Sequence, residues 1–233
     1  MTTFVLVPGA WLGGWCWGDV AAYLRAGGHR VICPTLTGLG ERAHLATPDI
    51  GLDTHIFDIT SVLHFQDLND VTLVGHSYGG TVITAVAERV PDRIRYMVYL
   101  DAAVPQDGES TNDVLGPELA ARIRSAVRGD KKWLVPPASV ADWELPDALR
   151  PWVEERLTPH PLRTLEEPVQ LRSKAAAMLR RAFIRSSQRS PLYGRLMEQG
   201  RSAGWYCRDM DGGHYPMLTQ SQALATSLTE LPP

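Results

Sequence analysis

The feature that most constrains this 233-residue chain is the pentapeptide Gly75-His76-Ser77-Tyr78-Gly79. An apolar run over 71–74 precedes it, and a segment with helical character follows over Thr81–Val90. A Gly-x-Ser-x-Gly pattern between a strand and a helix is typical of a sharp turn that holds a serine hydroxyl above the end of a sheet. The turn leaves the N–H of Tyr78 at a helix N-terminus, where it can stabilise an oxyanion. The pattern therefore predicts that Ser77 is a nucleophile, although a glycine-rich turn with a buried serine is the alternative.

Apolar and helical segments alternate along the first hundred residues. Strands are expected at Phe4–Val7, Arg30–Pro34, Val71–Val74 and Ile94–Leu100, and helices at Trp17–Ala26, Asp53–Leu68 and Thr81–Val90. This alternation predicts an α/β fold with a mostly parallel central sheet and right-handed crossovers. The stretch Thr35–Gly51 is expected to be a long loop, either a surface excursion or part of a pocket rim.

The alternation stops after Ala103. Residues 105–180 contain many of the prolines, show helical patterns at Pro117–Val127 and Ala148–Arg156, and contain no convincing strand. We expect residues 105–180 to form a helical lid inserted into a core made of residues 1–104 and 181–233. The core is expected to resume with a strand at Arg181–Arg185, a helix at Pro191–Ala203, a strand at Trp205–Arg208 and an amphipathic helix at Leu218–Leu231.

A serine hydroxyl is a poor nucleophile at neutral pH unless a base accepts its proton. His214 is the best candidate for that base, because it lies in a glycine-containing loop after the last expected strand. In enzymes with this kind of serine turn, the catalytic histidine comes last in chain order. A loop histidine without a chemical role is the alternative. The six rival histidines are His29, His44, His55, His64, His76 and His160.

Composition argues against several classes of partner. The net charge of −3 and the pI near 6.2 do not favour a nucleic-acid partner. No apolar stretch reaches the roughly 18 residues of a transmembrane helix, and the N-terminus lacks the pattern of a signal peptide. The three cysteines, Cys16, Cys33 and Cys207, are far apart and lack metal-ligand spacing. We therefore expect a reduced, cytoplasmic protein that uses no metal or cofactor, and the oligomeric state is left open, with a homodimer as one alternative.

The chain resembles the α/β-hydrolases in three stretches, Val7–Trp11, Gly75–Gly80 and Gly213–His214. It is more narrowly similar to the small esterase branch that includes plant methylesterases and hydroxynitrile lyases, through Gly9–Trp11, Gly13–Trp17, Leu24–Val31 and Leu36–Arg42. This resemblance covers residues 3–104 and about 182–231. It implies an α/β-hydrolase fold, a catalytic triad that contains Ser77 and His214, and an oxyanion hole formed by the backbone N–H groups of Ala10 and Tyr78.

The third member of the triad departs from the family pattern. Relatives place a carboxylate after the strand that here ends near Arg185, but residues 184–189 contain none. Asp101 follows the preceding strand, and neighbouring strand ends lie about 4.8 Å apart, so we expect its carboxylate to accept a hydrogen bond from His214. Asp101 could instead cap the start of the lid or bond backbone groups. The weaker alternatives are Asp107, Asp209 and Asp211, or no acid at all, with Ser186 or Ser187 orienting the histidine.

Two further departures bear on the reaction. Tyr215 follows the histidine where hydroxynitrile lyases of this branch have a lysine, which argues against cyanohydrin cleavage. Pro8 stands where many relatives have histidine, and it stiffens the loop without removing the N–H of Ala10. We expect an esterase for a small, largely apolar or aromatic ester; the alternatives are a non-hydrolytic lyase, cyclase or dehydratase, and a ligand-binding protein. The expected pocket residues are Trp11, Trp133, Trp143, Trp152 and Tyr215.

Overall fold

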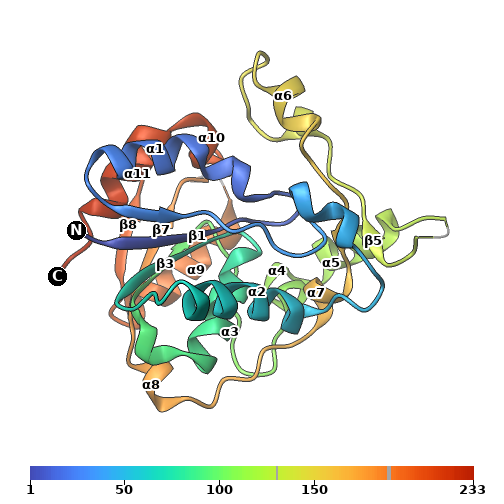
Figure 1. Cartoon of the computed structure of the whole chain (residues 1–233). Coiled ribbons are helices and arrows are strands. Elements are labelled where there is room, and N and C mark those ends of the chain that lie inside the picture. The colour runs from blue at the N-terminus through green and yellow to red at the C-terminus, as the bar shows by residue number, and fades with distance from the viewer. Residues whose placement is uncertain (130, 188–189) are drawn as a thin grey trace.

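A computed structural model describes residues 1–129, 131–187 and 190–233 of the chain. These residues form a central sheet of six strands in the order β2–β1–β3–β4–β7–β8 (Figure 1). The strands are β1 (Thr3–Val7), β2 (Arg30–Ile32), β3 (Val71–His76), β4 (Ile94–Leu100), β7 (Arg180–Arg185) and β8 (Tyr206–Asp209). Every pair of neighbours in this sheet is parallel, which confirms the predicted sheet.

Helices cover both faces of the sheet (Figure 1). On one face lie α1 (Gly18–Ala26) and α11 (Ser221–Thr229); on the other lie α2 (Leu52–Phe65), α3 (Gly79–Arg89) and α9 (Pro191–Ser202). Strand β1 shows why both faces must be covered. Phe4 and Leu6 pack toward α1 and α11, whereas Val5 and Val7 pack toward α2 and α3, because successive side chains of a strand point to opposite faces.

The segment 105–180 connects β4 to β7 and contains short elements. These are α4 (Thr111–Leu115), α5 (Pro117–Ala126), β5 (Leu134–Val135), a 3₁₀ turn (Val140–Asp142), α6 (Arg150–Glu154), β6 (His160–Pro161), α7 (Arg163–Glu166) and α8 (Lys174–Ala177). The expectation of no strand here was wrong, because β5 and β6 pair antiparallel. Strands of two residues are too short to show an alternating pattern in a sequence.

Other differences from the expected elements lie at turns. The loop Thr35–Gly51 contains a 3₁₀ turn at Gly40–Leu45, and other 3₁₀ turns lie at Gly14–Trp17 and Pro91–Arg93. The expected terminal helix is two helices, α10 (Pro216–Thr219) and α11, because Gln220 leaves the helical region with φ −136° and ψ 37°. In the part of the chain that the structure describes, no helix has both the length and the apolar character needed to cross a membrane.

Candidate active site

Ser77 lies at the turn between β3 and α3 in a left-handed backbone conformation, with φ 52°. Such a conformation costs a non-glycine residue roughly 1–3 kcal/mol and persists only where the surroundings enforce it. The glycines on either side permit the turn. A Cβ on Gly75 would lie 2.5 Å from the carbonyl oxygen of Gly79, and a Cβ on Gly79 would lie 2.8 Å from the carbonyl oxygen of Pro8. Backbone this close leaves no space for a side chain at either position.

The loop after β1 passes directly beside Ser77. A Cβ built on Gly9 would lie 3.0 Å from the Cβ of Ser77, so this loop brings Ala10 next to the turn. Tyr78 is the N-cap of α3. Among the hydrogen bonds of the described residues, none is donated by the N–H of Ala10 or Tyr78. Two such backbone donors beside a serine hydroxyl can bind the oxygen of a tetrahedral intermediate.

The structure brings Asp101 and His214 together. Asp101 follows β4, is fully buried, and holds its Oδ2 3.5 Å from Nδ1 of His214. Its carboxylate also accepts hydrogen bonds from the N–H of Ser186 at 3.0 Å and of Ser187 at 2.8 Å. Residues 184–187, at the end of β7 and in the loop after it, include no acid. This loop instead supplies two backbone N–H donors to Asp101, which follows the neighbouring strand β4.

The hydroxyls of the two serines in that loop do not orient the histidine. Neither Ser186 nor Ser187 has a side-chain hydrogen bond within the described ranges, and both approach Asp101 through their backbone instead. The other candidate acids make different contacts. Asp209 pairs with Arg185 at 2.6 Å, and Asp107 accepts from the N–H of Leu171 at 2.7 Å. Asp211 lines an open polar cavity beside His214.

Tyr193 of α9 is the neighbour of this site that sequence reasoning missed. Its ring lies nearly parallel to the ring of His214, at 12° and 5.1 Å between centroids. Its hydroxyl lies 3.4 Å from Nε2 of His214. Burial raises the pKa of Tyr193, and the charge of Asp101 raises it further. A single tyrosine in a helix gives no sequence signal of this position, which arises from how α9 packs.

A cavity of about 250 Å³ contains Ser77, His214 and Tyr193 in its wall. Most of its remaining wall is apolar, with Leu115, Leu119 and Ile123 contributed by α4 and α5. Two of the expected pocket aromatics, Trp11 and Tyr215, line it. The structure therefore places a serine and a histidine in the wall of an apolar cavity, which is an arrangement that can bind a small apolar substrate.

The other three expected aromatics do not line this cavity. Trp143 stacks on Tyr215 at 4.1 Å between ring centroids, and Tyr215 rather than Trp143 lines the cavity. Trp152 packs edge-on against Trp15, with the guanidinium of Arg156 over its ring. The carbonyl oxygen of Trp133 accepts from the N–H of Leu162. An aromatic residue in a sequence does not reveal the direction of its side chain; Trp143 and Trp152 pack on Tyr215 and Trp15, which lie outside segment 105–180.

The rival histidines have structural contacts. His76 hydrogen bonds through Nε2 to the carbonyl oxygen of His214 at 2.8 Å, and it lies in the cavity wall. His55 accepts from the hydroxyl of Tyr78 and donates to the carbonyl oxygen of Thr37. His160 lies 2.7 Å from the hydroxyl of Thr164 and accepts from the N–H of Trp11.

The remaining three histidines are His29, His44 and His64. His29 accepts a hydrogen bond from the N–H of Thr2, His64 packs on Phe65, and His44 is exposed.

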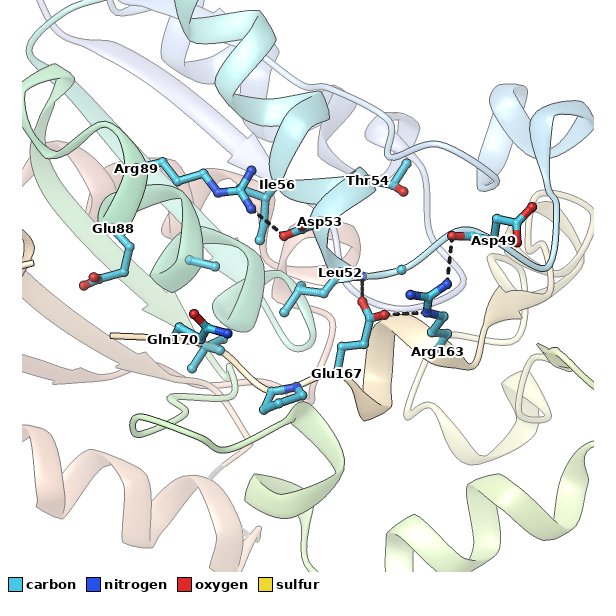
Figure 2. Close-up of a pocket in the computed structure, with 14 residues that line it drawn as sticks. Asp49, Leu52, Asp53, Thr54, Ile56, Glu88, Arg89, Arg163, Glu167 and Gln170 are labelled. Atoms are coloured by element: carbon cyan, nitrogen blue, oxygen red, sulfur yellow. Dashed lines mark hydrogen bonds and ion pairs between the residues drawn. The ribbon is translucent and has the colours of Figure 1, made fainter. Parts of the chain in front are cut away.

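A second cavity, of about 510 Å³, contains none of the predicted site residues (Figure 2). Its charged side chains bind one another or backbone groups. Glu167 accepts from the N–H of Leu52 at the start of α2 and pairs with Arg163, and Arg89 pairs with Asp53 (Figure 2). This cavity is therefore a polar junction between α2, α3 and the segment around Glu167.

Comparisons with known proteins extend over the whole fold. A model of the alpha/beta hydrolase family matches residues 4–227. A carbendazim hydrolyzing esterase from Nocardioides sp. strain SG-4G is 39% identical over 242 residues, which cover 99% of this chain and 100% of that protein. Methylesterase 8 of Arabidopsis thaliana is 37% identical over 114 residues, which are 48% of this chain and 42% of that protein. The structure of an extracellular alpha/beta-hydrolase from a Paenibacillus species superposes with a TM-score of 0.87 at 24% identity, covering 99% of this chain and 98% of that one.

Proposed function

We propose that this chain, which belongs to the alpha/beta hydrolase family and is a carboxylesterase-type hydrolase, cleaves small apolar or aromatic esters through an acyl-enzyme on Ser77. The observation that supports this mechanism is the convergence of three groups at the carboxyl edge of the parallel sheet. Ser77 follows β3 in a strained turn, Asp101 follows β4, and His214 lies 3.5 Å from that carboxylate.

In the proposed first step, His214 accepts the proton of the Ser77 hydroxyl while the serine oxygen attacks the ester carbonyl. The carboxylate of Asp101, 3.5 Å from Nδ1 of His214, stabilises the imidazolium that forms. The N–H groups of Ala10 and Tyr78 bind the oxyanion. Collapse of the intermediate transfers the proton to the leaving alkoxide, and water then releases the acyl group with His214 again as the base.

The cavity supports the proposed substrate class. Its volume of about 250 Å³ lies just below the range of roughly 300–1,000 Å³ found for ligand pockets, so it suits a small substrate. Leu115, Leu119 and Ile123 offer apolar contacts to the substrate. Because α4 and α5 supply these side chains, we propose that residues 105–180 act as a lid that shapes the substrate site. Trp11 and Tyr215 add aromatic surface to the cavity wall.

A second substrate class is favoured by the full-length similarity to the carbendazim hydrolyzing esterase. Carbendazim is an aryl methyl carbamate, whose carbonyl can be attacked by a serine oxygen in the same way as an ester carbonyl. We therefore include aryl methyl carbamates with methyl and 4-nitrophenyl esters as substrates to be tested.

The proposed function predicts the behaviour of Ser77→Ala. This variant removes the oxygen that forms the acyl-enzyme, so we expect kcat on 4-nitrophenyl acetate to fall by about 10⁴-fold or more. The wild-type protein is expected to gain the mass of one phosphonyl group from a fluorophosphonate probe, and the variant to gain none. Ser227→Ala, which changes a buried serine of α11, is the matched control and retains both activity and labelling.

Each alternative function predicts a different result. Activity or labelling that survives in Ser77→Ala contradicts the acyl-enzyme mechanism. A product that forms without uptake of ¹⁸O from labelled water supports a non-hydrolytic lyase, cyclase or dehydratase. Saturable binding of esters by the wild-type protein without any product supports a ligand-binding protein.

A further inference from the structure

Tyr193 occupies a position that the proposed triad leaves without a role. Its hydroxyl lies 3.4 Å from Nε2 of His214, and Tyr193 lines the same cavity as Ser77. Its ring is held flat against His214 and lies in the cavity wall, and its side chain is 9% exposed. Tyr193 is therefore a neutral hydrogen-bonding group at the point where bonds are made and broken.

The space around this hydroxyl is where the leaving group must lie. During acyl transfer, Nε2 of His214 first accepts the proton of Ser77 and then delivers it to the leaving oxygen. The leaving oxygen must therefore come within hydrogen-bonding distance of Nε2. The Tyr193 hydroxyl is already next to that atom, in the wall of the cavity that also contains Ser77.

We propose that Tyr193 donates a hydrogen bond to the leaving oxygen and so assists the departure of poorly activated alcohols from the tetrahedral intermediate. This inference rests on the proposed function, because it assumes that Ser77 and His214 carry out acyl transfer. It makes Tyr193 a catalytic residue that determines which esters the enzyme cleaves quickly. Methyl and other alkyl esters, whose alkoxides are strong bases, need this hydrogen bond most.

The step balances without any further reactant. The bond between the former carbonyl carbon and the leaving oxygen breaks, and its electron pair moves to that oxygen. The oxyanion reforms the carbonyl, and the proton on Nε2 of His214 moves to the leaving oxygen. Tyr193 keeps its own proton and stabilises the developing negative charge through its O–H. Because burial raises the pKa of Tyr193, the phenol stays protonated and remains a donor at neutral pH.

The test compares two esters of the same acid, methyl butyrate and 4-nitrophenyl butyrate, in wild type and in Tyr193→Phe. The phenylalanine ring keeps the stacking on His214 and removes only the hydroxyl. We expect kcat/KM, which reports acylation, to fall about 30-fold for methyl butyrate, the loss expected for a hydrogen bond to a charged group. For 4-nitrophenyl butyrate we expect a loss of about threefold or less, because 4-nitrophenolate leaves without assistance.

The ratio of the two losses decides the outcome. Equal losses on both esters would show that Tyr193 only holds Ser77 and His214 in place, and the proposal would be overturned. No loss on methyl butyrate would overturn it as well. The ratio does not depend on the fraction of folded enzyme, so partial misfolding of the variant leaves the test valid.

A matched variant and the serine variant separate the possible failures. Tyr96→Phe removes another buried phenol that does not line the cavity, and we expect it to leave the ratio unchanged. Survival of activity in Ser77→Ala would reject the acyl-enzyme itself. Equal losses in Tyr193→Phe, with Ser77→Ala inactive, would reject only the role of Tyr193.

Discussion

Asp101 combines three properties that a triad acid needs. It is fully buried, it lies 3.5 Å from Nδ1 of His214, and two backbone N–H groups hold its carboxylate in place. Its φ of 40° is in the left-handed region, which is uncommon for a residue other than glycine. Such strain is often kept at functional sites, so the backbone itself supports a role for this residue in orienting His214.

The residue-scale prediction is a large loss of activity in Asp101→Asn. An asparagine in this place cannot stabilise the imidazolium, and its amide favours the wrong tautomer of His214. We expect kcat on 4-nitrophenyl acetate to fall by about 10⁴-fold, the loss typical of this substitution in a triad. The measurement is steady-state kinetics on variants whose folding is verified by their unfolding midpoints.

The matched control for this prediction is Asp209→Asn. Asp209 is the last residue of β8 and lies at the same edge of the sheet as Asp101, but its carboxylate pairs with Arg185 rather than with His214. We expect this control to lose less than about threefold in kcat. If Asp101→Asn retained a tenth or more of the wild-type rate, another group would have to orient the histidine.

Single residues differ in how far a sequence predicts their positions. Ser77 lies in a five-residue pattern whose glycines are required by backbone contacts, so its turn can be predicted locally. The proximity of Asp101 to His214 could be predicted because both follow strands of one parallel sheet. Tyr193 could not be predicted, because its contact with His214 depends on the direction from which α9 packs. The same holds for Trp143, whose ring faces Tyr215 instead of the cavity.

Helix α2 depends on a carboxylate from a distant part of the chain. Glu167 accepts a hydrogen bond of 2.5 Å from the N–H of Leu52, the first residue of the helix, and also pairs with Arg163 (Figure 2). The residue before the helix is Gly51, which has no side chain to cap it. The negative charge of Glu167 lies at the positive end of the helix dipole and joins α2 to the segment after α7.

The element-scale prediction is a loss of stability in Glu167→Gln without loss of activity. The amide keeps the size of the side chain but removes the charge at the start of α2. We expect the free energy of unfolding to fall by about 1 kcal/mol, measured by urea denaturation. Because Glu167 does not line the cavity that contains Ser77, kcat is expected to change less than twofold.

Glu155→Gln provides the control for this stability change. Glu155 pairs with Arg156 at 3.7 Å, and its side chain is 78% exposed, so its ion pair contributes little. We expect this control to stay within about 0.5 kcal/mol of wild type. Equal effects of the two substitutions would mean that Glu167 does not stabilise α2.

Elements are predicted well from sequence when they are long and periodic. Helices α2, α3 and α9 and strand β4 lie within a few residues of the expected ranges, because each repeats an apolar pattern over its length. The pair β5–β6 has no such repeat, and the break between α10 and α11 depends on the backbone of one residue, Gln220. Tertiary contacts determine both features.

A buried network of neutral polar groups next to the Ser77 turn connects distant segments of the molecule. His55 of α2 accepts from the hydroxyl of Tyr78 at 2.8 Å and donates to the carbonyl oxygen of Thr37 at 2.9 Å. His160 of β6 packs against both His55 and Tyr78. The network thus joins the loop after β2, helix α2, the turn at Ser77 and the segment 105–180. Its hydrogen bonds require His55 to be neutral, because a protonated imidazole cannot accept from Tyr78.

The whole-molecule prediction is a loss of stability as the pH falls from 6.5 toward 4. Burial lowers the pKa of His55 to about 4; its bond to Thr37 and the charge of Asp58 oppose that shift, and Arg42 adds to it. In the unfolded chain the pKa of a histidine is about 6.5, so between these values the unfolded state binds more protons than the folded state. The free energy of unfolding therefore decreases with decreasing pH, by about 2 kcal/mol for His55 alone between pH 7.5 and 5.

The variant His55→Gln separates this contribution from that of the other buried histidines. Burial also lowers the pKa of His160 and of His76, so wild type takes up more than one proton on unfolding near pH 5. Glutamine remains neutral at every pH of the experiment, and we expect the slope of the free energy of unfolding against pH to decrease by about one proton. Urea denaturation at intervals from pH 7.5 to 4.5 measures that slope. The control His44→Gln changes an exposed histidine and is expected to keep the wild-type slope.

An unchanged slope in His55→Gln would mean that His55 is protonated in the folded protein. Tyr78 could then not donate a hydrogen bond to His55, and the network behind Ser77 would need a different set of hydrogen bonds.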